Sequence, residues 1–178
     1  MTRHPSIRLV RGDITRVAAD AIVNAANPSL TGGAGVNGAI LRAGGPEIVA
    51  DLEARYGQAR RCDPGQAVLS AAGALPARIV IHAVGPIWRG GDHGEDALLA
   101  SAYRVSLGVA AVEGCRSIAF PAISCGVYGY PLAAAARIAL TTVRAWLEDG
   151  PGRIDLVTFV LFSEPVMRAF ERAADRED

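Results

Sequence analysis

Two glycine-rich segments of this sequence have the composition of anion-binding loops. Residues 32–38 and residues 124–130 each hold several glycines between a predicted strand and a predicted helix. Bare main-chain N–H groups and the positive end of a helix favour a negatively charged ligand at such a position. Two such loops at the carboxyl edge of one sheet could hold the two halves of a diphosphate without any lysine. We therefore predict a diphosphate site formed by both segments, with a pair of plain tight turns as the alternative.

The charged residues exclude several other kinds of site. Of the 178 residues, 51% are apolar and 20% charged, and 18 acidic side chains balance 18 basic ones. This balance argues against nucleic acid or an anionic membrane as a partner, because both need a broad basic face. All 18 basic side chains are arginine, which excludes a Schiff-base lysine, a pyridoxal phosphate anchor and a Walker phosphate loop.

Cysteine and histidine usage predicts neither a metal nor a disulfide. The three residues of each type are scattered at spacings that match no metal site, so we expect no metal and no cofactor. No apolar run approaches the roughly 20 residues that span a bilayer, and no secretory signal pattern follows the first residues. We therefore expect a cytoplasmic, monomeric protein with free thiols.

Apolar runs and apolar spacing predict alternating strands and helices. Strands are expected at residues 7–10, 21–26, 67–71, 79–84, 117–122 and 154–162. Helices are expected at residues 36–43, 46–56, 95–113, 131–147 and 165–174. This alternation is typical of an α/β fold, in which helices cover both faces of a largely parallel sheet. A chain of this length is able to bury one core, so we predict a single domain over residues 1–178.

The spacing of Gly33, Gly35 and Gly38 also matches the dinucleotide-binding fingerprint, which would indicate an NAD-dependent oxidoreductase. That fingerprint needs its first glycine directly after a strand, but residues 27–31 intervene here. It also needs an acidic residue at the end of the following strand, about 20 residues on, and that region is predicted to be helical. The oxidoreductase stays the remote alternative.

Five segments of the sequence, in order, resemble the signature segments of a macrodomain. They are Gly12-Asp13-Ile14-Thr15, Ile22-Val23-Asn24-Ala25-Ala26-Asn27, residues 32–38 with Ala39-Ile40 and Arg42, Ile81-His82-Ala83-Val84-Gly85-Pro86, and residues 121–131. The similarity covers nearly the whole chain and is greatest to the MacroD-type branch. It implies a three-layer α/β/α macrodomain with a mostly parallel mixed sheet that binds ADP-ribose. It further implies hydrolysis of mono-ADP-ribose from Asp or Glu side chains of modified proteins, or deacetylation of O-acetyl-ADP-ribose.

The resemblance assigns the adenine end of the ligand to residues near the first and last strands. The Asp13 carboxylate would accept the adenine amino group, since an ionised carboxylate is acceptor-only. The main-chain N–H of Ile14 would complete this contact, and the Phe162 ring would stack on adenine. The alternatives are a helix-capping role for Asp13 and a core position for Phe162.

The resemblance assigns the remainder of the ligand to the two glycine-rich loops and the asparagines before the first of them. Asn27 would face the distal ribose and hold the attacking water, while Asn24 would fix the loop. Gly33, Gly35 and Val36 would surround the distal ribose and one phosphate. The diphosphate would lie on Ser124, Cys125, Gly126, Val127 and Tyr128, with the Tyr128 ring closing over the distal ribose. His82, inside an apolar strand, is interpreted as a core histidine rather than a base.

Asn37 departs from the pattern of the hydrolytic branch, where an aspartate is usual. An amide can hold a water molecule but cannot take its proton, and a general base contributes roughly 10²- to 10⁴-fold to a rate. Either a diphosphate oxygen of the substrate acts as base while Asn27 and Asn37 position the water, or the protein is a reader that binds ADP-ribose without cleaving it.

Overall fold

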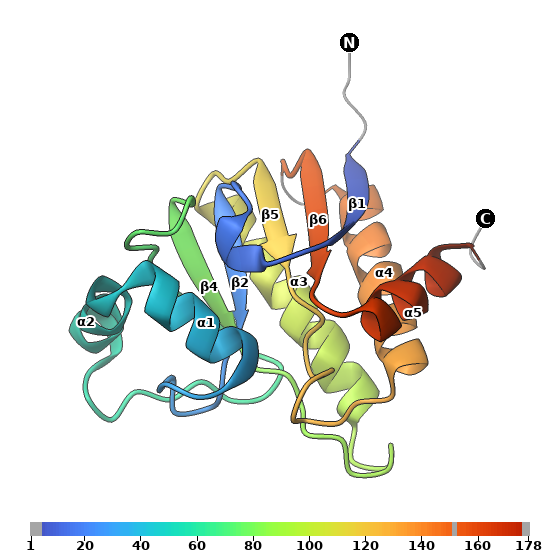
Figure 1. Cartoon of the computed structure of the whole chain (residues 1–178), viewed down its shortest axis with the longest axis horizontal. Helices are drawn as coiled ribbons and strands as arrows, with labels where there is room; N and C mark the ends of the chain where they lie inside the picture. Colours follow the sequence, from blue (N-terminus) through green and yellow to red (C-terminus); the bar gives the residue numbers. More distant parts are fainter. Residues whose placement is uncertain (1–4, 151–152, 176–178) are drawn as a thin grey trace.

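A twisted sheet forms the middle layer of the molecule (Figure 1). The computed structural model describes residues 5–150 and 153–175, and in this part of the chain six strands are ordered β1-β6-β5-β2-β4-β3. They are β1 (Ser6–Arg11), β2 (Ala21–Ala25), β3 (Ala67–Ala71), β4 (Ile79–Ala83), β5 (Ser117–Phe120) and β6 (Leu156–Leu161). Every pairing is parallel except that of the edge strand β3 with β4. The predicted mostly parallel mixed sheet is confirmed.

Helices cover both faces of this sheet, as predicted (Figure 1). Apolar side chains of α1 (Gly35–Gly44) and α2 (Pro46–Tyr56) pack on one face together with the short helix η1 (Ile14–Arg16). The other face is covered by α3 (Glu95–Val112), α4 (Leu132–Asp149) and α5 (Glu164–Asp175). Alternation along β2 explains both contacts, because Ile22 faces the first helix pair and Val23 the helices on the opposite side.

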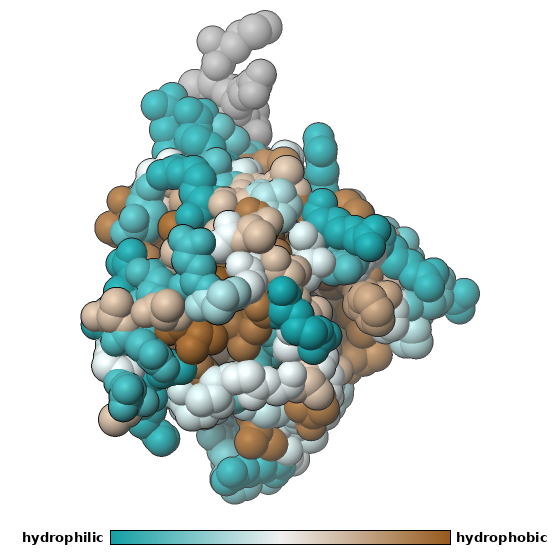
Figure 2. All heavy atoms as spheres, turned by 60° about the vertical axis from the view of Figure 1, so that its left-hand side comes forward, coloured by the Kyte–Doolittle hydropathy of each residue, from teal (hydrophilic) through white to brown (hydrophobic). Residues whose placement is uncertain are grey.

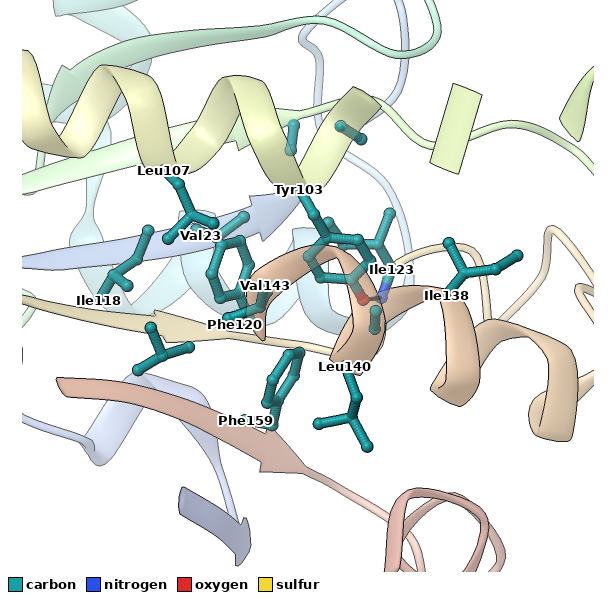
Figure 3. Close-up of a cluster of buried hydrophobic side chains, with 14 of the residues drawn as sticks. Val23, Tyr103, Leu107, Ile118, Phe120, Ile123, Ile138, Leu140, Val143 and Phe159 are labelled. Carbon is teal, nitrogen blue, oxygen red and sulfur yellow. Dashed lines mark hydrogen bonds between the residues drawn. The ribbon is translucent and has the colours of Figure 1, made fainter. Parts of the chain in front are cut away.

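The larger core lies between the sheet and helices α3 to α5 (Figure 3). The Tyr103 ring of α3 packs against Phe120 and Phe159 of neighbouring strands, with ring centroids 5.1 and 6.0 Å apart. Its hydroxyl oxygen accepts the main-chain N–H of Ile123 at 3.1 Å. Tyr103 therefore connects the core directly to the loop that follows β5.

Element bounds differ from the sequence prediction at a few ends. β5 and β6 each stop short of the predicted strand because pairing ends at Phe120 with Phe159 and at Arg11 with Leu161. Phe162 therefore lies just beyond β6 and is 83% exposed, which excludes the alternative of a core phenylalanine. Pro131 is the residue preceding α4 rather than part of its first turn.

The parallel strands all end at one edge of the sheet, and in Figure 1 the arrowheads of β2, β4, β5 and β6 point the same way. The segments that follow β1, β2, β4, β5 and β6 therefore meet at this edge. Ligands of open α/β sheets bind in the crevice outside the carboxyl ends of the strands. The fold thus brings both glycine-rich loops to the position where a ligand is expected.

The surface over α1 and α2, turned forward in Figure 2, is largely hydrophilic, with hydrophobic side chains in small areas between polar ones. Within the described ranges, no helix combines the length and apolar character needed to cross a membrane. The thiols of Cys62, Cys115 and Cys125 are all free, as predicted.

Replacing Tyr103 with Phe is expected to lower the free energy of unfolding by about 1 to 3 kcal/mol, because the buried Ile123 N–H would lose its acceptor. Chemical denaturation of both proteins measures this difference. Tyr56→Phe is the matched control, because the Tyr56 hydroxyl also bonds main-chain groups, those of Leu69 on the edge strand β3, but at an exposed position where water can replace it. Its loss should therefore be clearly smaller than that of Tyr103→Phe. Equal stability losses in the two variants would contradict the role given to Tyr103.

Candidate functional site

A cleft of about 400 Å³ lies at the carboxyl edge of the sheet, between the two glycine-rich loops. Nine of the predicted site residues line it: Asn27, Gly33, Gly35, Val36, Asn37, Ser124, Gly126, Val127 and Tyr128. They come from the segment after β2, the start of α1 and the segment after β5. The structure therefore brings together residues that are about 100 positions apart in the sequence.

The first wall of the cleft is the beginning of α1. The residue before this helix, Ala34, provides no side-chain cap, so the first N–H groups of the helix have no capping partner. Gly35 has a φ of 63°, and a Cβ atom on Gly38 would lie 2.2 Å from the Gly33 carbonyl oxygen. Glycine is required at both positions, and the result is an uncapped helix end that favours an anion.

The second wall is the loop from Ser124 to Tyr130. Ser124 has a φ of 66°, and its hydroxyl donates to the Pro86 carbonyl at 2.7 Å. The Trp88 N–H donates to the Tyr128 carbonyl at 2.9 Å, so the loop after β4 supports this wall from behind. Within the described part of the chain, the N–H groups of Gly126, Val127 and Tyr128 donate to no protein acceptor. These groups are available to an anionic ligand.

Five of the predicted site residues do not line the cleft: Asp13, Ile14 and Phe162, which belong to the expected adenine end, and Asn24 and Cys125. The Cys125 thiol donates to the Ile123 carbonyl and packs against the core, and burial raises the pKa of the thiol to about 12. The Cys125 N–H donates to the Ala122 carbonyl. Asn24 is fully buried. Cys125 is predicted to contact the diphosphate, but its polar groups are turned to protein partners and it does not line the cleft. Asn24, which is expected to fix the loop, donates a hydrogen bond to Asn37.

Asn27 uses its amide to shape its own loop. Its Oδ1 accepts the Thr31 N–H and the Ser29 hydroxyl, both at 3.0 Å, and its Nδ2 donates to the Thr31 carbonyl at 3.0 Å. Such side-chain to main-chain bonds are characteristic of Asn in turns. The roles of Ser29 and Thr31 were not predicted, although their spacing after an asparagine is a recognisable turn signal.

Asn37 is held by a chain of hydrogen bonds that begins in the sheet. The Ser70 hydroxyl donates to the Ala71 carbonyl at 2.9 Å, so it must accept from Nε2 of His82 at 2.8 Å. Nδ1 of His82 then accepts from Nδ2 of Asn24 at 3.1 Å, and the same Nδ2 donates to Oδ1 of Asn37 at 2.8 Å.

This chain fixes which end of the Asn37 amide points where. Its Oδ1 faces Asn24, and its Nδ2 donates to the Thr31 carbonyl at 2.9 Å. The Thr31 carbonyl therefore accepts from both Asn27 and Asn37, which closes the loop between the cleft and the sheet. Oδ1 of Asn24 is the one buried side-chain oxygen in the described residues without a partner. Asn24 and His82 are positioning residues for Asn37.

The expected adenine end lies beside the cleft, past the paired strands β1 and β6. The Gly12 N–H donates to the Leu161 carbonyl, so Asp13 and Phe162 follow neighbouring strand ends. Asp13 caps η1, accepting both the N–H and the hydroxyl of Thr15, and these bonds lower the pKa of its carboxyl. Ile14 is the first residue of η1, so its N–H has no acceptor within the helix. Asp13 therefore caps the helix through its Oδ1. Its Oδ2 takes no part in the cap.

The geometry does not match the dinucleotide-binding alternative. β2 ends at Ala25, ten residues before α1 begins at Gly35, so no glycine of the fingerprint follows the strand directly. The segment that would carry the ribose-binding acid is α2 rather than a strand. Residues 5–150 and 153–175 also contain no group of three or more His, Cys, Asp or Glu side chains that could hold a metal ion.

Comparison with known protein families matches residues 23–139 to the Macro domain. The O-acetyl-ADP-ribose deacetylase of Citrobacter rodentium is 54% identical over 166 residues, covering 93% of each chain. The protein of the same name from Enterobacter cloacae is 52% identical over 168 residues, covering 94% of this chain and 93% of its own length.

Solved structures with the same fold include complexes with nucleotides. A mutant of the Oceanobacillus iheyensis macrodomain with ADPR superimposes with a TM-score of 0.90 at 38% identity, covering 98% of this chain and 94% of that one. The Trypanosoma brucei macrodomain in complex with ADP-ribose gives a TM-score of 0.83 at 41% identity, over 94% of this chain and 68% of that chain.

The neutral state of His82 is expected to make stability depend on pH. Burial, with a smaller contribution from Arg60, lowers the pKa of His82 to about 4 in the folded protein. A histidine in the unfolded chain titrates near 6.5, so between these two pH values the imidazole is neutral only in the folded protein. This contribution to stability is present above pH 6.5 and is lost as the pH falls toward 4, by roughly 3 kcal/mol. Denaturation of the natural protein and of a His82→Gln variant at several pH values isolates it. An identical pH dependence in both would contradict the assignment.

Proposed function

This chain belongs to the macro domain family, and we propose that its cleft binds ADP-ribose. The diphosphate would lie between the two glycine-rich loops, the distal ribose at Asn27 and Asn37, and the adenine at Asp13 and Phe162. The observation that carries this proposal is that residues with unpaired N–H groups line one cleft from both sides, at the start of α1 and at residues 126–128. Main-chain donors of this kind suit a diphosphate in a protein with no lysine.

We propose that the reaction is hydrolysis of an ester on the distal ribose. The named relatives are O-acetyl-ADP-ribose deacetylases, and water added to that ester yields acetate and ADP-ribose. An ester between the distal ribose and an Asp or Glu side chain is the related substrate, and water would release ADP-ribose and restore the carboxyl group. In both cases the substrate supplies the anion that the two loops are suited to bind.

Asn37 determines how the attacking water is activated. Its Oδ1 accepts one bond from Asn24 and its Nδ2 donates one to the Thr31 carbonyl, which leaves one lone pair and one N–H for a water molecule. An amide takes no proton at neutral pH. We therefore propose that Asn37 and Asn27 position the water, and that a diphosphate oxygen of the substrate accepts its proton. The second candidate function, a reader that binds ADP-ribose without cleaving it, is favoured by the same observation, because a carboxylate base is missing at residue 37.

The biological setting follows from the proposed ligand. We propose ADP-ribose and mono-ADP-ribosylated proteins as the partners. The monomeric state, the cytoplasmic location and the single domain over residues 1–178 stay predictions, and both ends of that range lie outside the described residues.

Asn37→Asp is expected to release ADP-ribose from a glutamate-modified protein faster than the natural chain, by up to roughly 10²- to 10⁴-fold, because a carboxylate can take the proton of the water. The variant also loses the hydrogen bond to the Thr31 carbonyl, and two oxygens then face each other, so its melting temperature should fall. Release is followed by chromatography, with Asn37→Leu as the control that has similar size but no polar group.

Each result has a distinct meaning. Slow release by the natural chain, with less from Asn37→Leu, supports the hydrolase with substrate-assisted water activation. Release by Asn37→Asp alone would contradict that mechanism and identify the natural chain as a reader.

Asp13→Asn is expected to separate adenine recognition from helix capping. The Asn oxygen can still cap η1, but its NH₂ group would face the adenine amino group, so ADP-ribose should bind more weakly by about 1 to 3 kcal/mol. Calorimetric titration with ADP-ribose and with its inosine analogue measures the effect. The natural chain should prefer the adenine ligand and the variant should lose that preference. An unchanged ratio of the two affinities would overturn the assignment of Asp13.

A further inference from the structure

A second hollow, of about 260 Å³, adjoins the cleft. The two share Gly85 and Tyr128, and the hollow begins at Pro28, the residue after Asn27. Besides the shared Tyr128, its walls come from the loop after β2, the segment before β3, the loop between β4 and α3, and the first turn of α3. None of the residues assigned to ADP-ribose accounts for this hollow, apart from the shared Tyr128.

The order of the strands indicates which part of a substrate reaches the hollow. Phe162 follows β6, Ser124 follows β5, Asn27 follows β2 and Gly85 follows β4, and these strands are neighbours in that order. For a ligand with its adenine at the end of β6 and its distal ribose at the end of β2, the next strand end beyond the ribose is that of β4. The group attached to the distal ribose therefore points toward the end of β4, where the hollow lies.

The walls suit a carbon chain with a negative charge near it. The proline rings of Pro28, Pro64 and Pro86 line the hollow together with the half-exposed side chain of Ile87. Arg89 also lines it, and within residues 5–150 and 153–175 its guanidinium forms no ion pair. His93, the other basic group there, lies with Nδ1 3.9 Å from Glu95 and is charged only when protonated.

The loop that carries Arg89 is fixed in place by a buried carboxylate. Glu95 is 1% exposed and accepts the N–H groups of Arg89 at 2.9 Å, Gly91 at 3.1 Å and His93 at 2.7 Å. These bonds lower the pKa of Glu95 to about 2 against the opposing effect of burial, and they offset its charge. Glu95 therefore holds the loop in shape, and its carboxylate is turned to these N–H groups.

We propose, resting on the function proposed above, that this hollow binds the group leaving the distal ribose. Its occupant is the segment of a modified protein that carries the ADP-ribosylated glutamate or aspartate, with a further acidic residue next to it facing Arg89. An acetyl group has three heavy atoms, whereas the volume of the hollow corresponds to several water molecules at about 30 Å³ each. The hollow is thus larger than O-acetyl-ADP-ribose requires, and the peptide chain is the larger leaving group.

The test compares three substrates at low ionic strength: O-acetyl-ADP-ribose and two peptides with the same ADP-ribosylated glutamate. One peptide has aspartate on both sides of the modified residue and the other has arginine. The natural chain should have a kcat/KM about fivefold higher for the acidic peptide, the size of one exposed ion pair. Arg89→Glu should reverse this preference, and added salt should weaken it in both proteins.

Arg104→Glu is the matched control, because Arg104 is an exposed residue of α3 and the change in charge is the same. It should leave the preference of the natural chain intact. The rate with O-acetyl-ADP-ribose reports on the ADP-ribose cleft itself, since this substrate has no peptide to reach Arg89.

Outcomes for the hollow and for the proposed function can be told apart. Equal kcat/KM for the two peptides, or a preference that Arg89→Glu leaves unchanged, overturns the assignment of the hollow while O-acetyl-ADP-ribose is still cleaved. If no substrate is cleaved, the affinities of the two peptides are measured by titration instead. A preference of the same size for the acidic peptide supports the assignment, and equal affinities overturn it. If ADP-ribose itself does not bind, both the proposed function and this inference fail.

Discussion

The buried hydrogen-bond chain from Ser70 through His82 and Asn24 to Asn37 is the constraint on which the rest of the site depends. A serine has one proton to give, so donation to the Ala71 carbonyl sets the direction of every bond that follows. His82 must be neutral for this direction to hold, and its burial keeps it so. The amide of Asn37 is thereby oriented by a residue in the sheet rather than by the ligand. The cost is one buried Asn24 oxygen without a partner among the described residues.

The same constraint explains how a site without lysine attracts a diphosphate. Asn37 and Asn27 both hold the Thr31 carbonyl, and this fixes the loop just before the uncapped start of α1. Across the cleft, the bonds to Pro86 and from Trp88 fix the second loop with its N–H groups free. Positive potential at the site then comes from main-chain dipoles held in place before the ligand arrives.

Patterns along the sequence predicted the layers of the fold and most of the cleft, because apolar periodicity and glycine position are local signals. Nine predicted site residues line the cleft. Of the other five, Asp13, Ile14 and Phe162 belong to the expected adenine end, whereas Cys125 and Asn24 are turned to protein partners. The direction of a side chain in a tight loop or on a buried strand depends on the packing around it. The chain of bonds through Ser70 and His82 was missed for a different reason: it crosses three strands that only the pairing of β2, β3 and β4 brings together. The hollow near Arg89 likewise has no local signal.

The most direct test of the account is an NMR titration that follows the amide signals of the labelled chain as ADP-ribose is added. We expect large, saturable shifts for the N–H groups of Val36, Gly126, Val127 and Tyr128, with amides of β3 unchanged. ADP should move the same four signals, because it carries the same diphosphate. Binding that leaves these four signals in place and moves those of another surface would contradict the central claim that main-chain donors of the two loops hold the diphosphate.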